Sequence, residues 1–312
     1  MAADRRCTGK LNRQAQATSF TASFNCLWCG RPHQTRTDND LEGWARLCSD
    51  CIGRAQENEF LRYRLREGLR RRAEADERRA VGGRGDPDGD LRAYYAARAD
   101  EYDDWYLRRG RYSHGALADV AWAADLDTAT LWLDRLPIGG EIVELAAGTG
   151  WWSPLLAQKG QLWIYDAVEE PLERARDRLL AHGLAAHIHV RDAWAEPDRP
   201  VDALFCGFWL SHVPRARLDD FLAICRRWLK PGGTFAFIDS RRDPASSATD
   251  HPAPADDLSV RKLNDGRQFT IPKIYYEPAE LEHALISTGF VTARVTTTPR
   301  FFLLGEALVA PD

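Results

Sequence analysis

The 312-residue sequence lacks any apolar run of the length needed to cross a bilayer, which takes about 20 consecutive residues. Its basic start, MAADRRCTGK, is not followed by the apolar core of a secretory signal. The formal net charge of −4 argues against non-specific nucleic-acid binding. We therefore expect a globular cytoplasmic protein without a membrane span and without nucleic acid as its main partner.

Cysteine is not abundant, and its odd count of seven argues against a disulfide framework. Four of the cysteines form two CxxC pairs, Cys26 with Cys29 and Cys48 with Cys51. Their spacing is typical of a tetrahedral zinc site, in which each pair directs two thiolates at one point. Four thiolates close the coordination sphere, so we predict structural zinc. Rubredoxin-like iron is the alternative, because the sequence does not choose the metal.

We assign residues 1–58 to this zinc module, which is too small to bury a sufficient core without the metal. Basic residues exceed acidic ones in the first 80 positions. Trp28, Arg31, His33 and Arg36 could form a surface for a protein partner or a substrate. Equally, Trp28 could pack over the zinc knuckle.

Residues 59–90 form the predicted connector. Leu61, Leu65 and Leu69 recur every four positions, which gives one narrow apolar stripe on a helix. The following VGGRGDPDGD, residues 81–90, has the composition of a flexible linker. We place the domain boundary there and assign residues 91–312 to a catalytic domain.

The catalytic domain alternates predicted helices with short apolar strands. Two helices, 91–107 and 116–136, precede a strand at 141–145, which runs into the small-residue loop 146–150 and a helix at 153–159. This arrangement lets the backbone approach a cofactor closely. The loop alone does not identify the cofactor, because dinucleotide dehydrogenases also use such a loop.

Further strands are predicted at four places: 162–165, 186–190, 203–206 and 234–239. Asp166 ends the first of these and Asp192 follows the second. A carboxylate in the place of Asp166 can accept both ribose hydroxyls of a nucleoside. The alternation of strands and helices predicts an α/β fold with a parallel sheet.

The ordered segments EIVELAAGTG, YDAVEEPLERAR, VRDAW, ALFCGFWLSHVP and LKPGG resemble the class I S-adenosylmethionine (SAM)-dependent methyltransferases. The similarity is greatest to the branch with ubiquinone and menaquinone biosynthesis enzymes and natural-product methyltransferases. The similarity covers about residues 91–305. Each motif is weak alone, but the motifs are specific when taken together. The similarity implies a Rossmann-like seven-stranded sheet, SAM as cofactor and a small-molecule acceptor.

By position, the resemblance implies a cofactor site made of Glu144, Ala146, Gly148, Gly150, Asp166, Asp192, Ala193, Trp194 and Phe208. Ala146 replaces the usual glycine, and we expect a negative φ there, which admits a methyl group. Asp192 could instead cap the strand end. The aromatic helix, with Tyr94 and Tyr106, is expected to form a lid over the cofactor or to pack in the core.

Methyl transfer to a hydroxyl or a protonated amine needs a base. His212, after the fourth strand, is the best candidate, although it or Ser211 could simply cap the next helix. Asp239 and His114 are further candidates.

Residues 241–257 are predicted to form a mobile loop, and 258–276 a hairpin that turns at 264–266 and caps the acceptor pocket. Its basic residues Arg261, Lys262 and Arg267 could meet an acidic acceptor or face solvent.

Three functions fit these observations: a small-molecule methyltransferase, a methyltransferase for a protein, peptide or RNA recruited by the zinc module, and a non-enzymatic SAM-binding scaffold. The intact loop and acids argue against the scaffold. We favour the small-molecule enzyme because the chain is acidic overall and the hairpin suits an enclosed pocket.

Overall fold

The computed structural model describes residues 23–34, 41–81, 87–252 and 257–312. The chain divides into two compact units, residues 1–84 and 85–312, which are described separately below. The three-part division at residues 58 and 90 stays a prediction. No helix in the described ranges is both long and apolar enough to cross a membrane.

The N-terminal unit contains a hairpin followed by three helices. Strands β1 (Ser23–Asn25) and β2 (Pro32–Gln34) pair antiparallel, and α1 (Leu41–Ala45), α2 (Ser49–Gly53) and α3 (Glu59–Val81) follow. Its small core includes Cys26, Leu47, Cys51 and Leu61.

The predicted apolar stripe on α3 is only partly correct. Leu61 is buried and Leu65 packs against the same core, but Leu69 is 47% exposed. At Gly68 the helix touches α1 so closely that a Cβ would lie 2.8 Å from the Ala45 backbone. Because residues four apart drift by about 40° around a helix, Leu69 has turned away from the face that carries Leu61 and Gly68, and the stripe ends one turn early.

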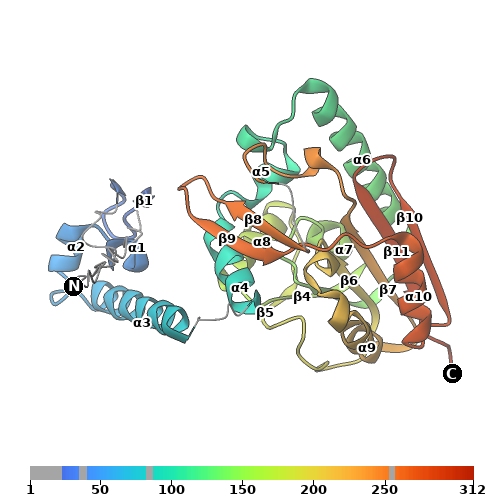
Figure 1. The fold of residues 1–312 in the computed structure, drawn as a ribbon. Helices are drawn as coiled ribbons and strands as arrows, with labels where there is room; N and C mark the ends of the chain where they lie inside the picture. Colours follow the sequence, from blue (N-terminus) through green and yellow to red (C-terminus); the bar gives the residue numbers. More distant parts are fainter. Residues whose placement is uncertain (1–22, 35–40, 82–86, 253–256) are drawn as a thin grey trace, which may run out of the picture. The chain divides into compact units, whose positions relative to one another are not determined.

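A seven-stranded sheet forms the centre of the second unit, in the order β10-β11-β7-β6-β3-β4-β5 (Figure 1). Its strands are β3 (Gly140–Leu145), β4 (Gly160–Asp166), β5 (His187–Val190), β6 (Val201–Gly207), β7 (Leu229–Ser240), β10 (Thr292–Thr297) and β11 (Phe302–Leu308). All neighbours pair parallel except β11, which runs antiparallel to both β7 and β10. The predicted Rossmann-like seven-stranded fold is confirmed.

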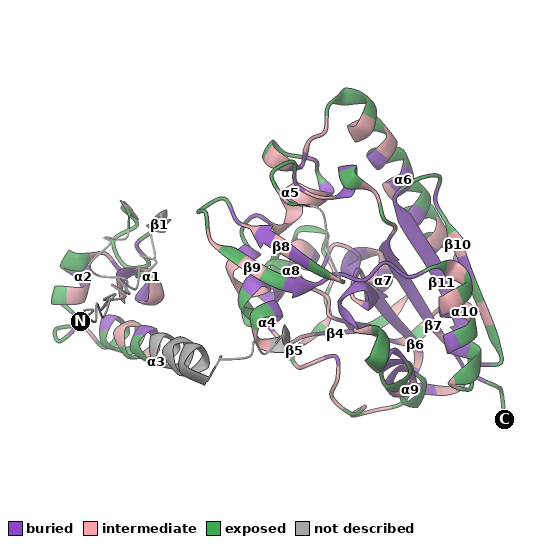
Figure 2. Cartoon of the chain, in the orientation of Figure 1, coloured by how far each residue is buried: buried purple, intermediate pink, exposed green. Residues whose placement is uncertain are grey.

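Helices accompany the sheet: α4 (Pro87–Arg98), α5 (Tyr102–Tyr106), α6 (Ala116–Arg135), α7 (Ser153–Lys159), α8 (Glu169–Ala181), α9 (Leu218–Trp228) and α10 (Pro278–Ser287). Two separate apolar clusters lie on the two faces of the sheet. Strand β3 supplies both, because Val143 and Leu145 belong to one cluster and Ile142 to the other. A strand covered on both faces reads as a continuous apolar run, and the sheet is largely buried (Figure 2).

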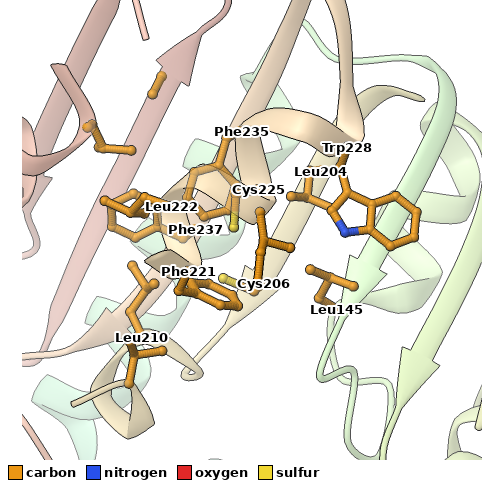
Figure 3. Packing of buried hydrophobic residues seen from close by; sticks show 14 of the residues in the cluster. Leu145, Leu204, Cys206, Leu210, Phe221, Leu222, Cys225, Trp228, Phe235 and Phe237 are labelled. Atoms are coloured by element: carbon orange, nitrogen blue, oxygen red, sulfur yellow. The ribbon is translucent and has the colours of Figure 1, made fainter. Parts of the chain in front are cut away.

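Helix α9 shows how the sequence determines one of these layers. Its apolar residues Leu218, Phe221, Leu222, Cys225 and Trp228 follow helical spacing and are all buried. Phe221, Leu222 and Trp228 pack beside Leu204 and Cys206 of β6 in one cluster (Figure 3).

The predicted helix 91–107 is wrong as a single element. Helix α4 ends at Arg98 and α5 starts at Tyr102. The break turns Arg98 inward, with its guanidinium 4.5 Å from the ring centre of Tyr102, and lets Glu101 accept the Asn264 amide N–H. These tertiary contacts override helix propensity.

The predicted linker 81–90 is also too long, since Val81 ends α3 and 87–90 belong to α4; residues 82–86 lie outside the described ranges.

The predicted hairpin is confirmed, with β8 (Leu258–Lys262) antiparallel to β9 (Gln268–Pro272). Leu91 and Tyr94 of α4 form one apolar cluster with Leu263 and Ile271 of the hairpin. The loop before it is not free: within 241–252, Trp105 Nε1 donates to the Ser246 carbonyl at 2.6 Å, and the Arg108 guanidinium donates to the Ala245 carbonyl. The expectation of a mobile loop is therefore wrong for this part, and residues 253–256 lie outside the description.

Candidate active site

The loop after β3 turns sharply toward α7. Gly150 has a φ of +69°, and a Cβ there would lie only 2.6 Å from the Ala175 Cβ of α8. Ala146 also has a positive φ, +50°, so the expected negative φ is wrong. The loop reverses directly at the strand end and leaves this position in the left-handed region, at a cost of about 1–2 kcal/mol for a residue with a Cβ.

Asp166 at the end of β4 is held in place by the loop. Its carboxylate accepts the backbone N–H of Gly148 and of Val168, each at 2.9 Å. Burial raises the pKa of Asp166 to about 6; the two amide hydrogen bonds oppose that shift and nearby Asp192 adds to it. The carboxylate is therefore fixed in orientation.

Asp192, after β5, makes two different contacts. One oxygen accepts the Trp194 amide N–H at 2.9 Å, as a strand-end cap does, and the other meets the guanidinium of Arg92 on α4 at 2.9 Å. The same residue lines the pocket beside Asp166. Asp192 therefore both caps the strand end and lines the pocket, so the two predicted roles are compatible.

These residues surround a pocket of about 680 Å³, its open mouth included. The predicted cofactor residues that line it are Ala146, Gly148, Asp166, Asp192, Ala193, Trp194 and Phe208. Four further residues line it, Leu91, Arg92, Tyr95 and Tyr102; sequence reasoning missed the first two and placed the two tyrosines only within the aromatic helix expected to form a lid. Only the density of tyrosines near Tyr95 and Tyr102 signalled their role.

The remaining predicted cofactor residues lie elsewhere. Glu144 is buried and accepts the Ser153 hydroxyl, and burial raises its pKa to about 8. Tyr106 stacks on Trp151 with ring centres 4.1 Å apart, in the core. Tyr94 lines a second pocket instead, and Gly150 is buried against α8. None of these four residues lines the first pocket.

His212 lies between the two pockets and lines both. Its Nδ1 is 2.7 Å from the Pro272 carbonyl oxygen and its Nε2 is 2.6 Å from the Tyr95 hydroxyl. A carbonyl can only accept, so Nδ1 carries the proton and Nε2 accepts from Tyr95. Burial, with the charge of Lys273, lowers the pKa of His212 well below its ordinary value. The imidazole is therefore neutral and has its basic nitrogen directed at Tyr95.

The other two base candidates line neither pocket. Asp239 accepts the amide N–H of Ser211 at 2.9 Å and of Ser240 at 2.6 Å, which fixes the short turn that carries His212. His114 Nε2 bonds the Ser247 carbonyl at 2.8 Å.

The second pocket, of about 490 Å³ with its mouth, shares Tyr95, Tyr102, Phe208 and His212 with the first. Of the three basic hairpin residues, only Arg261 lines it. Lys262 lies 3.8 Å from Asp250, and Arg267 pairs with Asp265 at 2.6 Å. Sequence reasoning missed two cations that line it, Arg98 and Lys273.

In the N-terminal unit, the four predicted metal ligands converge. The sulfur atoms of Cys26, Cys29, Cys48 and Cys51 all lie within 4.8 Å of one another, and Cys29 and Cys48 are 3.8 Å apart. Tetrahedral thiolates about 2.3 Å from zinc have sulfurs roughly 3.8 Å apart. The Cys26 sulfur also accepts the Cys48 amide N–H at 3.4 Å. The donor set and spacing therefore fit zinc.

Two of the residues predicted to form a binding surface on this unit, His33 and Trp28, make contacts within the unit. His33 pairs with the buried Glu42 at 2.7 Å, whereas Trp28 is 43% exposed and stacks on Phe60 with ring centres 5.8 Å apart. Arg36 lies outside the described residues.

Comparison with known proteins gives a consistent assignment. A family model described as a methyltransferase domain matches residues 142–233. The ubiquinone/menaquinone biosynthesis C-methyltransferase UbiE of Azotobacter vinelandii is 31% identical over 118 residues, which are 35% of this chain and 46% of that protein. UbiE of Ectopseudomonas oleovorans is 34% identical over 112 residues, 33% of this chain and 65% of the relative. The chain thus spans about half the length of the first of these relatives.

Two solved structures extend the similarity to a larger share of the chain. The structure of DhpI with SAH is 30% identical with a TM-score of 0.56 and covers 72% of this chain and 97% of DhpI. The DhpI complex with SAM and HEP is 29% identical, with the same TM-score, and covers 71% and 97%.

A parallel sheet with a tight loop after its central strand and carboxylates after the next two defines a Rossmann-like nucleoside-binding protein. Together with the near-complete coverage of DhpI and the methyltransferase-domain match, these features establish the family. The chain belongs to the class I SAM-dependent methyltransferases.

Proposed function

We propose that the chain transfers the methyl group of SAM to a small molecule bound in the second pocket. The observation that carries this proposal is the wall shared by two pockets, formed by Tyr95, Tyr102, Phe208 and His212. The first pocket has the acids and the loop that suit a nucleoside, and the second suits a compact acceptor. In-line transfer needs donor and acceptor held on one line with water excluded.

The residues present fit SAM. Asp166, fixed by two amides, would accept the ribose hydroxyls, and the Asp192–Trp194 turn would meet the adenine. The 146–150 loop allows close approach of the backbone, and Phe208 would lie along the methionine end. Bound there, SAM would supply the electrophilic methyl group, and S-adenosylhomocysteine (SAH) would be its demethylated product.

We assign the base to His212, acting through Tyr95. The acceptor hydroxyl would give its proton to the Tyr95 oxygen while Tyr95 passes its own proton to His212 Nε2. Burial raises the pKa of Tyr95 well above its usual range, so Tyr95 stays a donor. The Pro272 carbonyl, which holds Nδ1–H at 2.7 Å, stabilises the resulting imidazolium.

Calorimetric titration of the full chain with SAH tests the cofactor assignment. We expect binding by the wild type and a loss of at least tenfold in affinity for Asp166→Asn. Asp177→Asn, an exposed position on α8, is the matched control and should bind like the wild type. Failure of the wild type to bind SAH would refute the proposal.

We propose that Cys26, Cys29, Cys48 and Cys51 hold one structural zinc ion. The exposed Trp28–Phe60 stack supports an accessory docking role for this unit, and recruitment of a protein, peptide or RNA substrate is the second candidate function. Deletion of residues 1–85 separates the two: if methylation of a free small acceptor persists, delivery by the module is ruled out for that substrate.

A further inference from the structure

Three cationic side chains line the second pocket, and among the described residues no Asp or Glu lines it. Arg98 ends α4, Arg261 lies on β8 and Lys273 follows β9. Their exposures are 8%, 9% and 7%, respectively. Three charges removed from water in one small space repel one another and carry a large desolvation penalty unless an opposite charge meets them.

The hydrogen-bond partners of these cations are neutral. Lys273 Nζ donates to the hydroxyls of Ser211 at 2.8 Å and Ser240 at 3.0 Å. Arg261 donates to the Ser247 hydroxyl and to His251 Nδ1, each at 3.1 Å.

Arg98 is the least satisfied of the three. Its Nε is buried without a hydrogen-bond partner, and its guanidinium lies among the rings of Tyr94, Tyr102 and Tyr112, 4.5–5.5 Å from their centres. Aromatic faces and hydroxyls orient cations but do not neutralise them.

Nearby acids do not enter the pocket. Asp239 influences Lys273, but both of its oxygens accept backbone amides. Glu101 acts on Arg98 from outside the lining and accepts the Asn264 amide. Burial lowers the pKa of Lys273 to about 8; Asp239 opposes this shift, and Arg261 and Arg98 add to it. The positive charge of the pocket is thus uncompensated within its lining.

We infer that the methyl acceptor carries an oxyanion, a carboxylate or a phosphate-type group, which Arg98, Arg261 and Lys273 bind while the nucleophilic atom faces Tyr95 and His212. This inference rests on the proposed function, because it assigns the acceptor to the same second pocket. The wall shared with the SAM pocket defines the reacting side, and the three cations belong to the part of the lining that only the second pocket has. An arginine fork matches either oxyanion in two-point geometry.

The test uses the full chain saturated with SAH and titrated calorimetrically with sodium phosphate and, separately, with sodium acetate. We expect the wild type to bind at least one anion, and Arg261→Gln and Lys273→Gln to weaken that binding at least tenfold. Arg261→Lys, which keeps the charge but loses the fork, should weaken the binding less than Arg261→Gln does. Arg227→Gln, which removes an exposed arginine that pairs with Glu196 and lines neither pocket, is the matched control and should bind like the wild type.

The relative strength of the two anions distinguishes the source of the charge: tighter phosphate binding indicates a phosphate-type acceptor, and tighter acetate binding a carboxylate. A wild type that binds SAH but neither anion overturns the inference and leaves the proposed function standing. Loss of the SAH binding itself would refute the proposed function instead. Equal anion affinity in the wild type and both Gln variants also overturns the inference, and unchanged SAH affinity in the variants shows that they are folded.

Discussion

The Tyr95 hydroxyl lies 2.6 Å from His212 Nε2, and the Pro272 carbonyl, 2.7 Å from Nδ1, fixes the imidazole tautomer. This chain of hydrogen bonds joins α4, the turn after β6 and the end of β9. Its basic nitrogen is directed at the wall between the two pockets. In the proposed reaction, a proton released by an acceptor at that wall would reach the imidazole through the Tyr95 hydroxyl.

Replacement of Tyr95 by Phe should lower kcat by about 10²-fold, the lower end of the range for loss of acid–base assistance. His212→Gln should lower it at least as much. SAH affinity should change less than threefold in both variants. Tyr165→Phe, which removes a hydroxyl that donates to Asp198 at a position lining neither pocket, is the control. Unchanged kcat in both site variants, measured as SAH release with any acceptor that turns over, would exclude the relay.

SAH binding should weaken as the pH falls through about 6. Burial raises the pKa of Asp166 to about 6, so its carboxylate is charged above that pH and protonated below it. The charged form accepts ribose hydroxyls better, and the dissociation constant should rise by about tenfold per pH unit below 6. Calorimetry from pH 5 to 8 measures this, and Asp166→Asn should flatten the profile. A flat wild-type profile would show that Asp166 does not contact the cofactor as a carboxylate.

Two glycines with nearly equal φ angles allow the cost of backbone strain to be measured apart from the cost of a steric clash. Gly150→Ala places a Cβ 2.6 Å from the Ala175 Cβ at a φ of +69°, whereas Gly183→Ala, at +67°, meets nothing within 4 Å. Both variants bear a left-handed penalty of about 1–2 kcal/mol, and overpacking adds about 1–3 kcal/mol at Gly150 alone. Denaturant unfolding should therefore show Gly150→Ala as clearly the less stable. Equal losses of stability would mean that α8 moves aside.

Removal of the metal should unfold the N-terminal unit and spare the cofactor site. Purified chain should carry about one zinc per molecule by elemental analysis, and Cys51→Ser should lose it because three thiolates remain. Cys7→Ser, outside both CxxC pairs, should keep its zinc. Limited proteolysis should then cut the Cys51→Ser chain between residues 23 and 81, while SAH affinity stays unchanged. Iron in place of zinc would revise the metal but not the ligands.

The sequence by itself determined the elements whose residues are close together in the chain. The apolar runs predicted the five parallel strands, and the positions of Asp166 and Asp192 followed from where two of those strands end. The CxxC spacing predicted the sulfur cluster, because each knuckle is a local turn. The Asn264-Asp265-Gly266 turn predicted the hairpin for the same reason.

Only the tertiary structure decided the second pocket and the conformation of its walls. The break after Arg98 and the burial of Lys273 depend on contacts between segments far apart in the chain. Hydrophobic periodicity records which face of an element is buried, but not which distant polar group it meets there. Arg98, Arg261 and Lys273 come from three separate segments, and packing of α4 against the hairpin brings them to one space.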